Sequence, residues 1–318
     1  MTNTKELPKV GITGASGFVG KALIQRLLDD GYETLCLGRR DTTERTSFCK
    51  FDISDQFDVT EDLRAINVLV HCAARAHVMN EQSENPLKTY RKYNTDSTIR
   101  LAEQAASAGV SRFIYLSSVK AVGESTTNRE PYRYDSVLAP EDAYGISKAD
   151  AERGLLDIVK NSGMEVTIIR PPLVYGPGVK ANFAAMLKLA RKNLPLPLGS
   201  IKNQRSLVAI DNLVDLIVTC TTHRSAGNNT FMVSDGRDVT TPELLSAMTK
   251  AYGKSPKMIK FPPKLLALLA TALGKKSISD RLLDSLAVDI EHTRSTLNWE
   301  PKVNMDEALA KCTEGVGN

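Results

Sequence analysis

A glycine-rich segment near the start of the chain, GITGASGFVGKAL, restricts the possible folds more than any other feature of the sequence. Gly14, Gly17 and Gly20 follow a strand-like run at 9–13 and open a helical pattern at 18–30. In this spacing the first glycine allows a tight turn, the second lets the backbone approach a pyrophosphate, and the third allows close packing of the helix. The helix N-terminus then faces the phosphates of a dinucleotide. The other residues expected to meet the cofactor in this turn are Ser16, Phe18 and Val19.

Strand-like and helical patterns alternate as far as residue 170, and most of the strands are continuous apolar runs. Such runs are typical of a parallel sheet that helices bury on both faces. The expected strands are 9–13, 33–38, 48–52, 67–72, 112–117 and 165–170, and the expected helices are 18–30, 58–65, 87–109, 143–161 and 181–192. We therefore predict an α/β fold with a doubly wound parallel sheet at 1–172. A smaller C-terminal lobe is expected at 173–318, with some of its elements returning to the main sheet.

The charge balance argues against nucleic acid as a partner. The chain has 41 Lys and Arg against 37 Asp and Glu, a net charge of +4, and its basic residues form no concentrated stripe. The five cysteines are scattered, and three lie in apolar runs, which is typical of reduced thiols in a cytoplasmic protein. The four histidines show no spacing that suits a metal ion. We expect a cytoplasmic protein without a metal site.

One apolar run lies late in the chain, at 262–276, with the sequence PPKLLALLATALGKK. Lysines flank it, so an interfacial helix on a membrane surface is one interpretation. A helix buried in its own lobe is the more common fate of such a run. We therefore predict a buried helix and no membrane contact.

A tyrosine and a lysine stand four residues apart in AYGISKAD. In a helix this spacing puts Tyr144 and Lys148 on the same face. A phenol titrates near pH ~10, which is too high for proton transfer at neutrality. A neighbouring ammonium favours the phenolate and lowers that pKa. The pair is therefore a candidate for acid–base catalysis.

The segments TGASGFVG and YGISK together resemble the extended short-chain dehydrogenase/reductase superfamily, and the resemblance extends over nearly the whole chain. That superfamily includes nucleotide-sugar epimerases, dehydratases and 4-keto reductases. The resemblance implies a Rossmann domain for a nicotinamide cofactor and a C-terminal α/β lobe for the substrate. It also implies a homodimer, which here would use the helices at 87–109 and 143–161.

The resemblance assigns further residues to the cofactor. Asp52 matches an acid that contacts the adenine, and Ile53 is its neighbour. Ala73 and Ala74 match a loop that passes the middle of the cofactor. Asn94 matches an asparagine on the helix that follows.

Other matches surround the expected reacting centre. Counting back from the glycine of KAVGE, Ser118 takes the position of the catalytic serine or threonine, with Ser117 as the alternative. Its hydroxyl would bond the reacting oxygen of the substrate. Lys148 would also hold the nicotinamide ribose. Arg170 and Pro171 match the segment beside the nicotinamide.

Two arginines stand where many relatives carry an acid. In relatives that use NAD, an acid at the end of the second strand binds the adenosine ribose, but here Gly38 leaves that position empty. Arg39 and Arg40 supply planar donors that suit the extra phosphate of NADP. We therefore predict NADP(H) as the preferred cofactor. The alternative is a solvated loop in which the arginines pair locally, and this leaves NAD(H).

The resemblance predicts a nucleotide-sugar substrate, and a UDP-linked one in particular. Besides Ser118 and Tyr144, Asn182 and Arg205 match positions that contact the sugar nucleotide. The family's later Arg-x-Gly-Asp phosphate motif is absent, and Arg281 is a candidate replacement.

The residues after Ser118 narrow the reaction. Dehydratases of this superfamily carry Asp-Glu there, whereas this chain has Val119 and Lys120, so dehydration is not expected. The leading prediction is an NADP(H)-dependent reductase of the C4 keto group of a UDP-4-keto-6-deoxy-hexosamine. The alternative is an NAD-dependent 4-epimerase of UDP-hexoses or UDP-N-acetylhexosamines. A non-catalytic cofactor sensor is a third reading, which the Ser118, Tyr144 and Lys148 set argues against.

Overall fold

The computed structural model describes residues 7–41, 44–75, 84–272, 274, 280 and 282–314. Its strands are β1 (Val10–Thr13), β2 (Thr34–Gly38), β3 (Ser47–Lys50), β4 (Val68–His71), β5 (Arg112–Leu116), β6 (Glu165–Arg170), β7 (Leu173–Tyr175), β8 (Leu207–Ala209) and β9 (Asn229–Met232). The α-helices are α1 (Phe18–Asp29), α2 (Thr60–Leu63), α3 (Pro86–Tyr90), α4 (Ser97–Ala108), α5 (Ala143–Asn161), α6 (Ala181–Lys192), α7 (Ile210–Thr222), α8 (Thr241–Ala251), α9 (Pro263–Ala272), α11 (Glu291–Leu297) and α12 (Met305–Thr313). Short 3₁₀ turns η2 (Val119–Ala121) and η3 (Arg224–Ala226) and a π-helical stretch η1 (Arg91–Asp96) complete the described elements.

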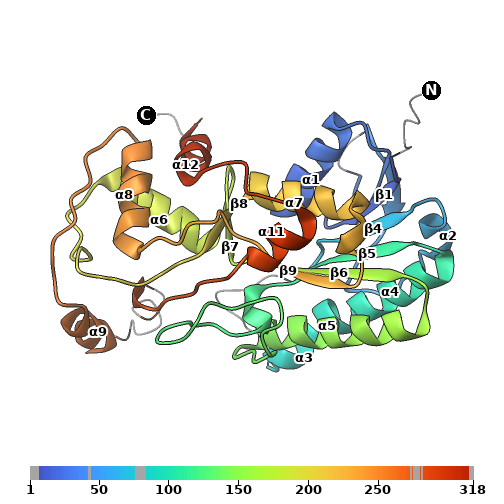
Figure 1. Cartoon of the computed structure of the whole chain (residues 1–318), viewed down its shortest axis with the longest axis horizontal. Helices are drawn as coiled ribbons and strands as arrows, with labels where there is room; N and C mark the ends of the chain where they lie inside the picture. Colours follow the sequence, from blue (N-terminus) through green and yellow to red (C-terminus); the bar gives the residue numbers. More distant parts are fainter. Residues whose placement is uncertain are drawn as a thin grey trace.

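Seven strands form the main sheet in the order β3-β2-β1-β4-β5-β6-β9, and every pair is parallel. The order reverses beside β1, which creates the crevice where doubly wound sheets bind their ligands. Figure 1 shows α1, α7 and α11 over one face of this sheet and α4 and α5 over the other. The predicted doubly wound Rossmann fold is confirmed.

Side chains that alternate along each strand fill two separate cores. Val70 of β4 packs with the α1 and α7 face, whereas its neighbour Leu69 packs with the α4 and α5 face. Burial on both faces explains why the strands read as unbroken apolar runs. The expected helix at 87–109 begins with α3, passes through the π-helical stretch η1, and continues as α4. It ends at Gly109, whose φ of 86° is the left-handed conformation in which glycine commonly caps a helix.

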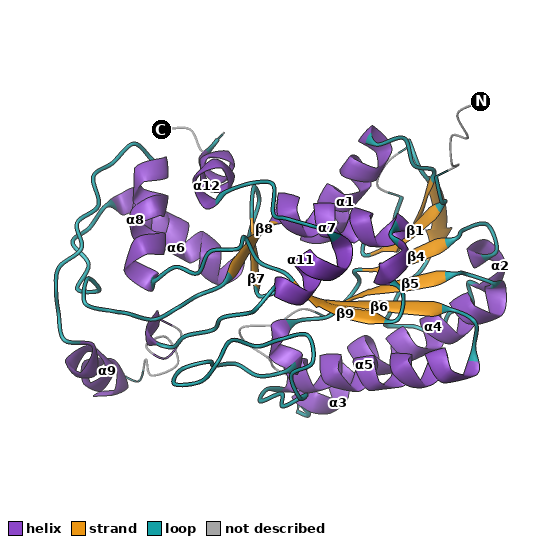
Figure 2. Ribbon diagram, in the orientation of Figure 1, coloured by secondary structure: helices purple, strands orange, loops and turns teal. Residues whose placement is uncertain are grey.

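The second half of the chain contributes to both lobes. β7 and β8 pair in a small parallel sheet, and α6, α8 and α12 surround a third core that includes Phe183, Leu245 and Leu309. Between these elements the chain returns to the main sheet, where α7 packs beside α1 and β9 pairs with β6. Figure 2 shows the two strand groups as separate orange bundles joined by teal loops.

The prediction of a buried helix at 262–276 is wrong for the part that the structure describes. No residue of α9 is buried. Only Leu266 among its leucines packs partly against the third core. In the described part of the chain, no helix has the length and apolar character needed to cross a membrane.

Candidate active site

The glycine turn joins β1 to α1 in a conformation that requires its glycines. Gly14 has a φ of 72°, and a Cβ added to it would lie 2.7 Å from the backbone nitrogen of Ala73. A Cβ on Gly20 would lie 2.2 Å from the carbonyl oxygen of Gly14. Helix α1 begins directly after Gly17, and no side chain makes a capping hydrogen bond there. The first N–H groups of α1 thus remain for a phosphate, which is what a dinucleotide site needs.

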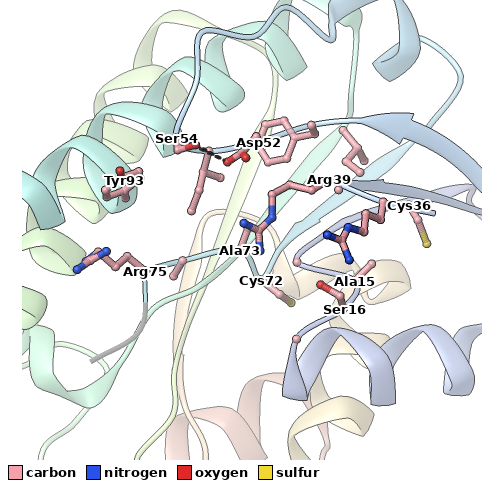
Figure 3. Close-up of a pocket in the computed structure, with 18 residues that line it drawn as sticks. Ala15, Ser16, Cys36, Arg39, Asp52, Ser54, Cys72, Ala73, Arg75 and Tyr93 are labelled. Atoms are coloured by element: carbon pink, nitrogen blue, oxygen red, sulfur yellow. Dashed lines mark hydrogen bonds between the residues drawn. The ribbon is translucent and has the colours of Figure 1, made fainter. Parts of the chain in front are cut away.

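A cavity of about 570 Å³ opens at the carboxyl ends of β1, β2, β3 and β4. Figure 3 shows side chains from all four strand ends converging on it. The predicted cofactor residues that line it are Gly14, Ser16, Gly17, Arg39, Arg40, Asp52, Ile53, Ala73 and Ala74. The predicted residues that do not line it are Phe18, Val19, Gly20, Asn94, Lys148, Arg170 and Pro171. The sequence interpretation missed Ser54, Arg75 and Tyr93, which lie on the same strand-end loops and on η1.

The pocket places positive charge beside an acid. Asp52 accepts hydrogen bonds from the backbone nitrogen of Ser54 at 2.9 Å and from its hydroxyl at 2.8 Å. These bonds, with a smaller contribution from the charge of Arg39, hold the pKa of Asp52 below its usual value. Arg39 and Arg40 are both exposed, and Figure 3 shows Arg39 pointing into the pocket. The pocket therefore brings the carboxylate of Asp52, on the loop after β3, near the guanidinium groups of Arg39 and Arg40, which follow β2.

A buried histidine that the sequence interpretation did not find connects the strand ends below the pocket. His71 is 1% exposed, and its Nδ1 lies 2.7 Å from Thr13 Oγ1. Its Nε2 lies 3.0 Å from Thr98 Oγ1. The backbone nitrogen of Ala73 donates to Thr13 Oγ1 at 3.2 Å. Burial lowers the pKa of His71 to about 3, so this neutral imidazole fixes the two loops that line the pocket.

Asn94 lies behind the pocket rather than on its surface. It is 1% exposed on η1, where its Oδ1 accepts from the backbone nitrogen of Arg75 at 2.8 Å. Its Nδ2 donates to the Arg75 carbonyl and to Ser147 Oγ, both at 3.1 Å. Asn94 therefore ties the loop after β4 to helix α5, one residue before Lys148. π-helical stretches of this kind often occur at functional sites.

The three predicted catalytic residues meet beside the end of β5. Ser118 caps η2 just after β5, and its hydroxyl lies near enough to the phenol of Tyr144, on the first turn of α5, to oppose the rise in that phenol's pKa. Lys148 lies one turn further on, is 2% exposed, and donates to the Leu116 carbonyl at 2.8 Å. Its Nζ is 6.0 Å from the ring centre of Tyr144 and 4.6 Å from that of Tyr115. The predicted trio is thus brought together, and its catalytic role stays a prediction.

The expected effect of Lys148 on the tyrosine is not what the structure shows. Burial raises the pKa of Tyr144 to about 12, the charge of Asp142 adds to this, and the bond with Ser118 opposes it. Burial also lowers the pKa of Lys148 to about 8. Desolvation disfavours the charged form of both groups and is the largest cause of both pKa shifts.

The amino-acid sequence of this chain is similar to those of known proteins. Residues 10–234 match the family model described as the NAD dependent epimerase/dehydratase family. The chain belongs to this family. A UDP-glucose 4-epimerase of Vibrio cholerae is 43% identical to it over 98% of this chain and 97% of that protein. The chain is therefore an NAD(P)-dependent enzyme of the extended short-chain dehydrogenase/reductase type.

Solved structures with low identity share the fold. The UDP-glucose 4-epimerase of Thermotoga maritima, solved with UDP-glucose, has a TM-score of 0.76 at 21% identity and covers 96% of this chain and 97% of its own. The UDP-glucuronic acid 4-epimerase of Bacillus cereus, solved with NAD, has a TM-score of 0.76 at 21% identity and covers 95% and 94% of the two chains.

A buried ion pair supports the active site of this epimerase/dehydratase family member. Glu152, one turn after Lys148, is 1% exposed and lies 2.6 Å from the Nη2 of Arg170. Ser117 is also buried and donates a short hydrogen bond to Glu152, so its hydroxyl is already engaged, whereas Ser118 meets Tyr144. Arg170 is held at the end of β6 by Glu152 and the Tyr134 carbonyl. Arg170 therefore links β6 to α5, and its expected position beside the nicotinamide stays a prediction.

A backbone hydrogen bond and two ion pairs hold the segment around η2 in place. The Pro171 carbonyl accepts a hydrogen bond from the backbone nitrogen of Val119 at 2.9 Å, which holds η2 against the end of β6. Lys120 forms ion pairs with Asp142 at 2.6 Å and Glu124 at 2.9 Å. Asp142 also caps α5 by accepting from the Gly145 nitrogen at 2.6 Å. Lys120 thus anchors the start of the helix that carries Tyr144.

The predicted substrate residues of the C-terminal lobe are separate from the pocket at the glycine turn. Asn182 is exposed in the first turn of α6. Arg205 is partly buried, pairs through its backbone with Val239, and donates from its guanidinium to the Asp284 carbonyl at 3.3 Å. Arg281 lies outside the described residues. Their contact with a sugar nucleotide stays a prediction.

Proposed function

We propose that this protein is an NAD-dependent 4-epimerase of a UDP-hexose or a UDP-N-acetylhexosamine. The observation that carries the proposal is the convergence of Ser118, Tyr144 and Lys148 at the end of β5, in a chain 43% identical over nearly its whole length to a UDP-glucose 4-epimerase. Val119 and Lys120 continue to argue against dehydration, because neither supplies the acid that elimination needs.

The roles follow from the protonation states of the site. Tyr144, with a pKa of about 12, is protonated at neutral pH and can donate a proton to a C4 oxygen. Lys148, with a pKa of about 8, is mostly charged at pH 7. That charge lies 6.0 Å from the phenol ring, where it would lessen the cost of forming the phenolate in the reverse proton transfer, although burial keeps the pKa of Tyr144 high. Ser118 would orient the C4 oxygen. A bound nicotinamide would accept and return the hydride.

A second candidate is the NADP(H)-dependent reduction of a UDP-4-keto-6-deoxy-hexosamine. Its support is the position of Arg39 and Arg40, which both line the pocket at the end of β2. Guanidinium groups there suit the extra phosphate of NADP. The relatives favour the epimerase over this reductase, because the Vibrio cholerae protein named above is a 4-epimerase.

Cofactor content and product analysis distinguish the two reactions. An epimerase returns the hydride to its own substrate and has no need to exchange cofactor. We expect purified protein to carry NAD, seen by mass spectrometry after denaturation. It should interconvert UDP-glucose or UDP-N-acetylglucosamine with the 4-epimer without net cofactor use. Tyr144→Phe should abolish this conversion, and Tyr252→Phe, in the C-terminal lobe, serves as the matched control.

Stoichiometric consumption of NADPH with a UDP-4-keto-6-deoxy-N-acetylhexosamine, by protein purified without cofactor, would instead establish the reductase. Binding of a dinucleotide without turnover of any of these sugars would support the sensor.

We also propose that the enzyme is a homodimer formed through α4 and α5. Both helices cover one face of the main sheet, and Leu156 on α5 is 47% exposed. Sedimentation velocity checks this, and a monomer at micromolar concentration would contradict it.

A further inference from the structure

Helix α9 presents an apolar face that the rest of the chain leaves uncovered. Leu265, Leu268 and Leu269 are 43%, 65% and 48% exposed. Their spacing of three and four residues places them on one side of the helix. Leu266 faces the other way, partly buried against the third core. Figures 1 and 2 show α9 at the outer end of the C-terminal lobe, far from the main sheet.

The surroundings of this face are strongly basic. Between Glu243 and Asp280 the sequence has seven lysines and no acidic residue, although the whole chain has a net charge of only +4. Lys257, Lys260 and Lys264 are exposed just before or at the start of α9. The side chain of Ile259, between two of them, is 51% exposed. The segment from Lys257 to the end of α9 therefore exposes both apolar side chains and lysines.

We propose that α9 docks the enzyme on the surface of an anionic phospholipid bilayer. The helix has ten residues, too few to cross a bilayer, but it can lie in the headgroup region with its leucines toward the acyl chains. The lysines would then contact lipid phosphates. The positive charge of the lysines around α9 argues against a second copy of the chain on this face. A symmetric contact would bring together two copies of a segment that has seven lysines and no acidic residue of its own.

Vesicle sedimentation with the full chain tests the proposal. Unilamellar vesicles of phosphatidylglycerol and phosphatidylethanolamine should bind the wild type, whereas pure phosphatidylcholine vesicles should bind it weakly. Replacing all three exposed leucines by serine should lower the partition coefficient at least about tenfold, because each leucine transfers apolar surface to the bilayer. Lys260→Gln with Lys264→Gln should lower it about fivefold per lysine, and salt should weaken wild-type binding. Val137→Ser, at a site 83% exposed elsewhere in the chain, should change nothing.

Folding and self-association are followed in the same variants. The leucine variant should keep the wild-type circular dichroism spectrum and bind dinucleotide normally, since α9 contributes nothing to the glycine-turn pocket. Three results would each overturn the proposal. Wild type could fail to bind anionic vesicles, or bind phosphatidylcholine equally well. The leucine variant could lose self-association in sedimentation velocity while no form binds vesicles, which would identify a second copy as the partner.

Discussion

Replacing His71 by glutamine should remove much of the protein's sensitivity to mild acid. The imidazole is buried as a neutral group between Thr13 and Thr98, with a pKa of about 3 in place of the usual 6.5. An unfolded chain takes up a proton at this position below pH 6.5, whereas the folded chain does not until about pH 3. The folded state is therefore progressively disfavoured as the pH falls through that interval.

The size of the effect follows from the two pKa values. Each pH unit below 6.5 lowers the free energy of unfolding by about 1.36 kcal/mol for one such group, so acidification from pH 7 to pH 5 should cost roughly 2 kcal/mol. Burial also lowers the pKa of His292, and that histidine contributes with the same sign. The difference between wild type and His71→Gln isolates the share of His71.

Urea unfolding at pH 7 and pH 5 measures this difference. The wild type should lose about 2 kcal/mol more than His71→Gln over the interval. Thr98→Val is the matched control, because it removes the hydrogen bonds of the Thr98 hydroxyl to His71 and to the Asn94 carbonyl and keeps the imidazole. It should cost about 1–3 kcal/mol at both pH values and retain the wild-type loss on acidification. If His71→Gln lost as much stability as the wild type between the two pH values, the reasoning would be refuted.

Three further predictions concern the active site. Tyr144→Phe should lower turnover about a hundred- to ten-thousand-fold with nearly unchanged cofactor affinity, and retention of more than about a third of the rate would contradict its role as the acid. If the arginines select NADP(H), Arg39→Asp should erase a preference of roughly ten- to a hundred-fold in measured dissociation constants, and equal binding of NAD(H) and NADP(H) by the wild type would rule this out. Glu152→Gln should lower the free energy of unfolding by about 3–5 kcal/mol, because it leaves the buried Arg170 charge without its partner, and a loss below about 1 kcal/mol in urea unfolding would show that the pair is not needed.

The sequence predicted the parts of the fold that depend on local pattern. Unbroken apolar strands and the glycine turn were sufficient for the parallel sheet and the position of the pocket. β9 was not predicted as a strand, because its four residues, NTFM, are half-buried at a sheet edge and show neither alternation nor an unbroken apolar run. Helix α9 of the C-terminal lobe was wrongly expected to be buried, because apolar composition does not tell which neighbours will cover a helix.

In the active site, too, residues with a local sequence pattern were predicted, whereas contacts between residues far apart in the sequence were not. Ser118, Tyr144 and Lys148 carry their own spacing signals, and the structure brings them together. The partners of Arg170 lie 18 and 36 residues away in sequence, so no local pattern could show that Glu152 and Tyr134 hold it. The contact between His71 and Thr13 spans 58 residues and is equally invisible in the sequence.

After β8 the chain returns to the main sheet, so neither lobe is made of one continuous segment of sequence. α7 and β9 belong to the sheet half, yet they lie in sequence between β8 and α8 of the other half. Truncation after residue 172 would remove β9 and leave the edge of β6 open to aggregation. The chain also passes between the two lobes more than once. We therefore expect the lobes to move relative to each other less than two domains joined by a single linker would. Melting in a single cooperative step is the expected behaviour, and new substrate specificities would have to arise within the loops rather than by exchange of a whole lobe.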